Sequence, residues 1–210
     1  MKLPSGDDQE FIPLPEARAA NIEGARVMVT IAGVSGSLRK GSLNTALLRA
    51  AKELAPKGVE INIVSIADIP LYNGDEEAAN GLPGSVVAFK EALASADGVL
   101  LVTPEYNNGI PGVFKNAIDW ASRPAGDIAK VFGDKPFAVI GASPGGFGTI
   151  LSQNHWLPVL RTLGVRFFAG DRLMASRAHQ AFDESGALTD DALRGRLSAY
   201  VEAFANFIRR

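Results

Sequence analysis

Short apolar runs alternate along the chain with segments whose apolar residues recur at helical spacing. The apolar runs occupy residues 27–32, 60–64, 98–103, 136–142 and 166–168. The run at 98–103, GVLLVT, has no polar alternation, which is typical of a parallel strand covered on both faces. The pattern therefore predicts five buried strands.

Amphipathic segments follow these runs. Their spacing predicts helices that start near Ser42, span 85–95, 111–122 and 149–163, and begin for the last time near Asp190. Regular alternation of strand and helix predicts an α/β fold with a parallel sheet between two helical layers. Five strands and five helices favour the flavodoxin-like three-layer sandwich, with strand order 2-1-3-4-5 and a switch point between the first and third strands.

Residues 1–24 depart from this pattern. They are rich in proline, glycine and charge and show no sustained period. Such a segment is either a flexible leader or an arm that packs on a neighbour, and we predict a flexible extension. The remaining residues, 25–210, are predicted to form one domain, because a 210-residue chain with 47% hydrophobic residues can bury a single core.

A turn joined to an amphipathic helix follows the third predicted strand. Asn107, Asn108 and Gly109 tolerate positive φ, and Pro111 suits a first helical position. The turn holds three polar residues at the carboxyl edge of the sheet, namely Glu105, Tyr106 and Asn107. A βα turn without a ligand would show the same local pattern. We interpret Glu105 as a residue that shapes the loop rather than as a general acid.

The segment after the first predicted strand offers an anion site. Gly33 and Gly36 loosen the backbone, and Ser42 or Asn44 caps the next helix. Hydroxyl, amide and guanidinium groups gather before and within the first helical turn, from Ser35, Ser37, Arg39, Ser42, Asn44 and Thr45. A helix N-terminus beside an arginine favours a terminal phosphate. The alternative interpretation is that this segment is a serine-rich surface turn that binds no ligand.

The glycine spacing of this segment narrows the choice of phosphate-containing ligand. Residues 36–42, GSLRKGS, lack the lysine that follows the second glycine in a P-loop, which argues against ATP or GTP hydrolysis. The segment also lacks the G-x-G-x-x-G of dinucleotide folds. A mononucleotide fits better than either.

A glycine-rich loop follows the fourth predicted strand. Gly145, Gly146 and Gly148 let the backbone approach a flat ligand, and Ser143 supplies a hydrogen-bonding hydroxyl. Glycines alone are a weak signal. Their position matters more here, because three successive loops point to the same edge of the sheet.

Together these motifs resemble the NADPH-dependent FMN reductases, which include bacterial chromate and quinone reductases. The resemblance runs from about residue 27 to the C-terminus and rests on three segments, GSLRKGSLN at 36–44, PEYNNGIPGVFKNAIDW at 104–120, and Ser143 with Gly145 and Gly146. It implies bound FMN, with NADPH or NADH as the reductant. The FMN phosphate would be held by Ser37, Arg39, Ser42, Leu43, Asn44 and Thr45. The isoalloxazine ring would be flanked by Pro104, Glu105, Tyr106 and Asn107, and its other edge lined by Ser143, Gly145 and Gly146.

The resemblance implies hydride transfer from NAD(P)H to the flavin and then electron transfer to a quinone, chromate or related small acceptor at the same site. A flavodoxin-type electron carrier is an alternative, although such carriers are usually strongly acidic and this chain has a net charge of −2. A nucleotide-binding protein without enzymatic activity is another. The preference between NADH and NADPH and the physiological acceptor stay open.

Arg123, beside Pro124, is the candidate for substrate binding. We expect it to face the mouth of the site and attract an anionic acceptor or the NADPH phosphate. A cation near a helix C-terminus is stabilised by the helix dipole, which would explain the residue equally well. Members of the resembled family form dimers or tetramers, so a homodimer or homotetramer is expected, with residues 108–120 as a contact surface.

Composition excludes several other classes. A net charge of −2 gives no basic footprint for nucleic acid. The chain has no cysteine, and its two histidines, His155 and His179, are too isolated to suggest a metal centre. It also shows no apolar run long enough to span a bilayer and no signal-peptide core, so we expect a cytoplasmic protein.

Overall fold

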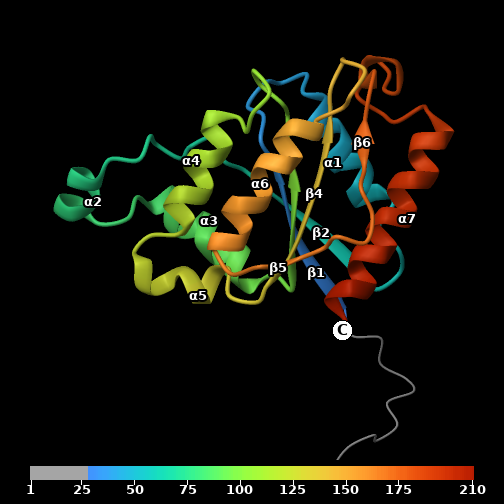
Figure 1. Ribbon diagram of the computed structural model, residues 1–210. Helices are drawn as coiled ribbons and strands as arrows, with labels where there is room; N and C mark the ends of the chain where they lie inside the picture. The colour runs from blue at the N-terminus through green and yellow to red at the C-terminus, as the bar shows by residue number, and fades with distance from the viewer. Residues whose placement is uncertain (1–27) are drawn as a thin grey trace, which may run out of the picture.

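The computed structural model describes residues 28–210 and shows one parallel sheet between two layers of helices (Figure 1). The prediction of a flexible extension at residues 1–24 lies outside the described residues. The sheet runs in the order β2-β1-β3-β4-β5, and the short β6 pairs with the end of β4. The strands are β1 (Val29–Ser35), β2 (Val59–Val64), β3 (Gly98–Val102), β4 (Pro136–Ala142), β5 (Arg166–Phe167) and β6 (Met174–Ala175). The predicted flavodoxin-like strand order is confirmed.

Helices cover both faces of this sheet (Figure 1). One face is covered by α1 (Leu43–Glu53) and α7 (Asp191–Ile208). The other is covered by α3 (Gly84–Ser95), α4 (Gly112–Ala121), α5 (Ile128–Val131) and α6 (Ile150–Thr162). The short helix α2 (Gly74–Asn80) projects to the side of this layer, and two 3-10 turns, η1 (Ala125–Asp127) and η2 (Ala178–Gln180), complete the elements.

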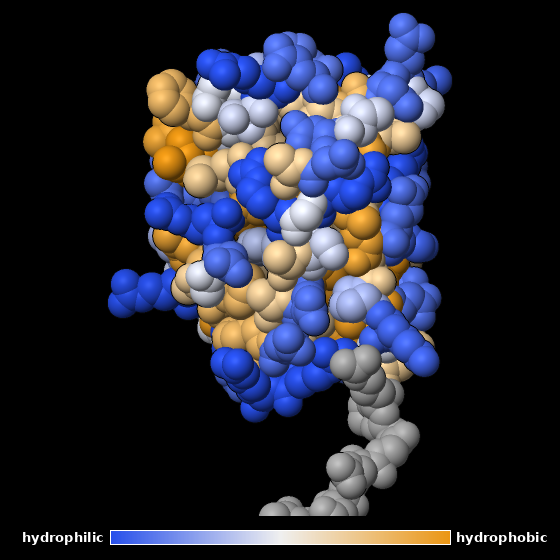
Figure 2. All heavy atoms as spheres, turned by 90° about the vertical axis from the view of Figure 1, so that its right-hand side faces the viewer, coloured by the Kyte–Doolittle hydropathy of each residue, from blue (hydrophilic) through white to orange (hydrophobic). Residues whose placement is uncertain are grey.

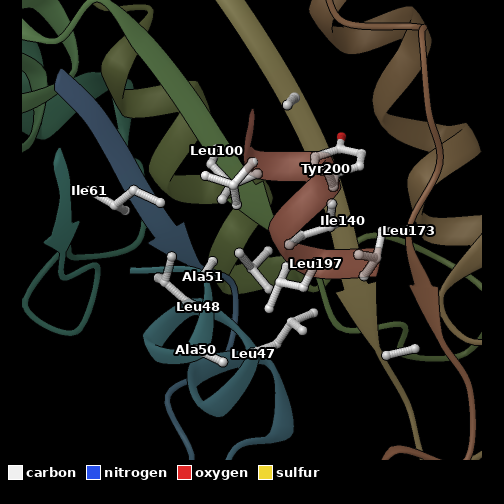
Figure 3. Packing of buried hydrophobic residues seen from close by; sticks show 14 of the residues in the cluster. Leu47, Leu48, Ala50, Ala51, Ile61, Leu100, Ile140, Leu173, Leu197 and Tyr200 are labelled. Carbon is white, nitrogen blue, oxygen red and sulfur yellow. The ribbon is translucent and has the colours of Figure 1, made fainter. Parts of the chain in front are cut away.

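Two hydrophobic clusters hold the layers together. All five residues of β3 and all seven of β4 are buried, as expected for strands covered on both faces. Figure 3 shows Leu47 and Leu48 of α1 and Leu197 of α7 pointing toward the sheet residues Leu100 and Ile140. On the opposite face, Phe114 of α4 and Trp156 of α6 pack edge to face with ring centroids 5.0 Å apart.

The first strand differs from its predicted bounds. It spans Val29–Ser35 instead of residues 27–32, because its residues pair with β2 as far as Val34 and with β3 as far as Ser35. Gly33 therefore lies inside the sheet and does not loosen a loop. A Cβ at Gly33 would lie 2.6 Å from Leu48 Cδ1, so the glycine lets α1 approach the strand.

The remaining differences concern short elements. The fifth strand ends at Phe167, one residue before its predicted end, and β6, α2 and α5 were not predicted. Among residues 28–210, no helix combines the length and the apolar content needed to cross a membrane.

Candidate functional site

Three loops meet at the carboxyl ends of the central strands. The first loop (residues 36–42) follows β1, the second loop (residues 103–111) follows β3, and the third loop (residues 143–149) follows β4. The Oγ atom of Ser37 and the hydroxyl of Tyr106 are 3.5 Å apart, so the first and second loops touch. This juxtaposition lies at the switch point between β1 and β3, where open α/β sheets bind ligands.

The first loop is fixed by contacts beneath it. The backbone N–H of Gly36 donates to Val102 O at 2.9 Å. A Cβ at this position would lie 2.1 Å from Phe114 Cδ1, so α4 packs directly against the loop backbone. Only glycine permits this close approach.

The start of α1 presents free backbone donors. Ser42 is the N-cap, and its Oγ accepts the N–H of Thr45 at 3.2 Å. The N–H groups of Leu43 and Asn44 have no acceptor within the described chain. Arg39 is exposed, and its guanidinium lies near Gly41, because a Cβ at Gly41 would lie 3.5 Å from its Nη1 atom. Two free donors, a helix dipole and a guanidinium fit a phosphate monoester.

Three side chains assigned to the phosphate make other contacts. The Asn44 amide donates to Ala142 O at 2.8 Å and accepts from Ala142 N at 2.9 Å, which joins α1 to β4. The hydroxyl of Thr45 lies 2.9 Å from that of Ser35. Leu43 packs against the core. Leu43 and Asn44 could still contact a phosphate through their backbone N–H groups, whereas the N–H of Thr45 is bonded to Ser42 Oγ. The assignment of the three residues to the phosphate stays a prediction.

The second loop forms a tight reversal. Tyr106 N donates to Gly109 O at 3.2 Å, and Gly109 N donates to Tyr106 O at 3.0 Å. Asn107 and Asn108 adopt positive φ of 50° and 62°, as a type I′ turn requires. Of the three residues that tolerate positive φ, the two asparagines adopt it and Gly109 does not. Tyr106 is thereby presented at the surface, 51% exposed.

Glu105 links the second loop to α6. One carboxylate oxygen, Oε2, accepts the N–H groups of Leu151 and Ser152 at 2.9 and 3.0 Å. The helix has no side-chain cap from its own N-cap residue, Thr149. A carboxylate on free N–H groups at a helix start is stabilising. This geometry agrees with Glu105 as a loop-shaping residue.

Backbone bonds hold the third loop from one side. Ser143 N donates to Ala175 O at 3.0 Å, and Arg177 N donates to Gly145 O at 2.8 Å. The other side is open: a Cβ at Gly146 would meet no heavy atom within 4 Å. An exposed backbone without side chains suits the edge of a flat ring, so this loop fits a flavin. Gly148, at a φ of 63°, needs glycine for its backbone conformation.

Arg123 lies away from the three loops. It follows the C-terminal end of α4, about 15 Å along the helix axis from the second loop. Its Nε atom donates to Glu77 Oε2 at 2.8 Å and to Oε1 at 3.1 Å. The guanidinium lowers the pKa of the Glu77 carboxyl, and the carboxylate raises the pKa of Arg123. A role toward an anionic acceptor stays a prediction.

Several site contacts had no local signal in the sequence. The Ser37–Tyr106 and Glu105–Leu151 contacts join residues 69 and 46 positions apart. Buried Thr103 also joins β3 to α6, because its hydroxyl contacts Ser152 at 2.8 Å and accepts the Trp156 indole N–H at 3.1 Å. Among residues 28–210 there is no group of three or more acidic, histidine or cysteine residues placed to hold a metal.

Comparison with known proteins agrees with this geometry. The family model for NADPH-dependent FMN reductases matches residues 29–180. The chain is 43% identical over 182 residues to an NAD(P)H-dependent FMN reductase of Pseudomonas aeruginosa, covering 87% of this chain and 96% of that protein. It is 38% identical over 179 residues to a 2-hydroxy-1,4-benzoquinone reductase of Burkholderia sp, covering 85% and 96%.

A solved structure has the same fold. The flavoenzyme NAD(P)H:(acceptor) oxidoreductase FerB of Paracoccus denitrificans superposes with a TM-score of 0.75 at 37% identity, covering 86% of this chain and 97% of that one. The family match covers well over half of the chain and includes all three loops. The protein therefore belongs to the NADPH-dependent FMN reductase family of oxidoreductases.

Proposed function

We propose that this protein is an FMN-dependent NAD(P)H oxidoreductase whose acceptors are quinones. The observation that carries the proposal is the meeting of the three loops around one edge of the sheet, with free N–H groups at the start of α1 and an open backbone at Gly146. Relatives named FMN reductase and benzoquinone reductase support this choice of reaction.

When FMN is bound, it would supply the redox chemistry, namely acceptance of a hydride from NAD(P)H and transfer of electrons to an acceptor. The chain's own residues bind and orient the cofactor. The start of α1 and Arg39 would hold the phosphate, while Tyr106 and the third loop would border the ring. Glu105 keeps the second loop seated on α6. One shared site predicts that NAD(P)H and acceptor bind in alternation.

Anaerobic stopped-flow absorbance of the FMN-loaded protein tests this reaction. We expect NADPH or NADH to bleach the oxidised-flavin band and a quinone to restore it. A flavin that both nucleotides leave oxidised would favour an electron carrier. Failure to bind FMN would overturn the assignment of the three loops.

The acceptor class needs a separate comparison. Rates of turnover with a neutral quinone, chromate and free FMN are measured under matched conditions, and they rank the three compounds as acceptors. If Arg123 attracts anions, Arg123→Ala raises the KM for chromate much more than that for the quinone. An equal effect on both would leave Arg123 with the structural role that its contact with Glu77 shows.

We further infer that the protein forms a homodimer or homotetramer. Apolar side chains lie exposed on the third loop and on α6, among them Phe147, which is 82% exposed, with Leu151 and Leu157. A second copy would cover these residues next to the site. Light scattering of the purified protein tests this, and a monomer would contradict it. We also propose that the protein works in the cytoplasm, where NAD(P)H is supplied.

A further inference from the structure

A small network of polar groups is buried behind the second loop, between the end of β3 and the first turns of α6. Thr103, which follows β3, has no exposed surface, and neither have Ser152 and Trp156 of α6. At the end of the molecule that carries the three loops, many hydrophilic residues lie at the surface when it is viewed from the side of α7 (Figure 2). The polar groups of the three buried residues are cut off from water, so each needs a partner within the protein.

The donors and acceptors of this network fix the direction of the Thr103 hydroxyl. Trp156 Nε1 can only donate, and it donates to Thr103 Oγ1 at 3.1 Å. The carbonyl oxygen of Pro104 can only accept, and it lies 2.9 Å from the same Oγ1 atom. Thr103 has one hydroxyl proton, which therefore goes to Pro104 O. Ser152 Oγ, 2.8 Å away, then donates its own proton to Thr103.

The reverse direction would leave two groups without partners. If Thr103 donated to Ser152, the Pro104 carbonyl would lose its donor, and the Ser152 proton would find no other acceptor among residues 28–210. Buried polar groups without partners are rare in folded proteins. The hydroxyl of Thr103 is therefore locked onto the Pro104 carbonyl, with both of its lone pairs occupied.

The direction of this carbonyl sets the direction of the next N–H group. The peptide between Pro104 and Glu105 is trans, and in a planar trans peptide the C=O and N–H bonds point in opposite directions. Because the C=O points at Thr103, the N–H of Glu105 points away from the buried network. Glu105 is half-buried, and its N–H has no acceptor among residues 28–210. A ligand at the second loop can therefore use this donor.

The side chain of Glu105 holds the same peptide from its other end. Its Oε2 atom accepts the N–H groups of Leu151 and Ser152 at 2.9 and 3.0 Å. The hydroxyl of Thr103 and the carboxylate of Glu105 thus both rest on the first turn of α6, which starts at the loop end of the sheet (Figure 1). A donor that is fixed in advance needs no reorganisation when a ligand binds.

We propose that Thr103 is a positioning residue for the flavin: by bonding to the Pro104 carbonyl, it directs the N–H of Glu105 to the ring of FMN. The proposal rests on the proposed function, in which the second loop flanks that ring. Trp156 and Ser152 contribute by occupying the lone pairs of Thr103. The positive end of an N–H dipole stabilises negative charge, and the flavin ring gains electrons on reduction. Thr103 therefore raises the reduction potential of bound FMN.

Hydrogen exchange of the wild-type amides tests the direction of the Glu105 N–H without any variant. In the protein without FMN, this amide should exchange faster than that of Thr103, which donates to Ile140 O at 2.8 Å. Loading with FMN should slow exchange at Glu105 about tenfold or more. NMR spectra of the free and the loaded protein measure both rates. A Glu105 amide that is protected before FMN is added, or that FMN leaves unchanged, would overturn the proposal.

The variant Thr103→Val removes the hydroxyl and keeps the shape of the side chain. Potentiometric titration should give a midpoint potential for bound FMN about 30 mV or more below that of wild type, which is a tenfold change in the equilibrium constant of a two-electron couple. Thr103→Ser keeps the hydroxyl and should restore the potential. An unchanged potential in Thr103→Val, or no recovery in Thr103→Ser, would overturn the role of Thr103.

Tyr200→Phe is the matched control for the loss of a buried hydroxyl. The Tyr200 hydroxyl is buried as well and donates to Val139 O of β4 at 3.3 Å, from the face of the sheet that α7 covers. This variant should lower the midpoint of urea unfolding and leave the potential of FMN unchanged. Equal shifts of the potential in Tyr200→Phe and Thr103→Val would assign the shift to lost stability and overturn the proposal.

These measurements also separate the role of Thr103 from the proposed reaction, because exchange and potentiometry with a chemical reductant need no NAD(P)H. The expected exchange and potential shifts in a protein whose flavin stays oxidised with NAD(P)H would defeat the proposed reaction and keep the role of Thr103. Rapid turnover of NAD(P)H and quinone, with exchange at Glu105 and the potential of Thr103→Val both unchanged, would do the reverse.

Discussion

Gly36 of the first loop packs against a neighbouring side chain, whereas Gly146 of the third loop faces open space. A Cβ on Gly36 would lie 2.1 Å from the ring of Phe114, which is fully buried against Trp156. Gly36→Ala is therefore expected to destabilise the fold by about 1–3 kcal/mol, as other overpacked cores do. It should also weaken FMN binding, because the first loop must shift. Urea unfolding and a flavin fluorescence titration measure the two effects.

Gly146→Ala is the matched variant in open space. A Cβ there meets no protein atom within 4 Å, so the free energy of unfolding should stay within about 0.5 kcal/mol of wild type. The added methyl group would point into the space that the flavin edge is predicted to occupy, and FMN affinity should fall. Unchanged affinity would remove Gly146 from the ring site.

Glu105 makes a prediction that separates positioning from proton transfer. Glu105→Ala removes the acceptor for two N–H groups at the start of α6 and should cost about 1–2 kcal/mol of stability. Glu105→Gln keeps an acceptor oxygen, so it should restore most of that stability and retain the pH profile of quinone turnover. A Gln variant that folds and binds FMN but loses turnover would assign the carboxylate to catalysis instead.

At the scale of elements, Asn44 fastens α1 to β4. Its buried amide makes two hydrogen bonds to the backbone of Ala142, 2.8 and 2.9 Å long. Asn44→Ala would leave a buried N–H and a buried C=O without partners, which we expect to cost about 2–4 kcal/mol.

Thermal and urea unfolding of Asn44→Ala measure this loss. The control is Asn80→Ala, since Asn80 ends the exposed helix α2 and bonds only to Glu76 on the same helix. It should change stability by less than about 0.5 kcal/mol. Equal effects of the two variants would show that Asn44 has no special part in holding the helix.

The main strands and helices were predictable because the pattern of apolar residues along the chain reflects which positions are buried. The strands at 98–102 and 136–142 are uninterrupted apolar runs, and their neighbours show helical spacing. Gly33 was misassigned because a glycine after an apolar run indicates a turn, whereas here its missing side chain admits Leu48. The two-residue strand β6 and the small helix α2 are too short to show a period.

The position of the three loops at one edge of the sheet was predictable as well. Strand order places the three loops at one edge, so spacing along the chain was enough to group them. Which side chains remain free for a ligand depends on distant partners. Asn44 is occupied by Ala142, 98 residues away, and Arg123 by Glu77, 46 residues away. Sequence patterns do not carry such pairings.

At the scale of the whole molecule, the ion pairs that join different elements lie away from the three loops. The three loops lie at the carboxyl ends of the strands. Among residues 28–210, the two ion pairs that join different elements lie near the C-terminal end of α4, and the other two lie within α4 and α7. Arg123 joins α2 through Glu77, and Lys90 joins α3 to η1 through Asp127. Titration of these pairs should therefore change stability with little direct effect on the loops.

Acid should weaken this charged region first. Arg123 donates to the Glu77 carboxylate and lowers its pKa, and Lys90 does the same for Asp127. A carboxyl whose folded-state pKa is lowered stabilises the fold fully above its unfolded-state pKa, about 4.3 for glutamate, and loses this contribution as the pH falls through the folded-state value. Stability should thus decline as the pH drops below about 5.

Urea unfolding between pH 6 and pH 3 tests the assignment to Glu77. Glu77→Gln should flatten the decline, because the variant has no carboxyl to protonate at that position. Arg123→Gln should flatten it as well, since it removes the donor that lowers the pKa of Glu77. The double variant should do no more than either single one, as residues that act through one contact are not additive. A decline as steep as wild type in Glu77→Gln would mean that other carboxyls govern the acid response.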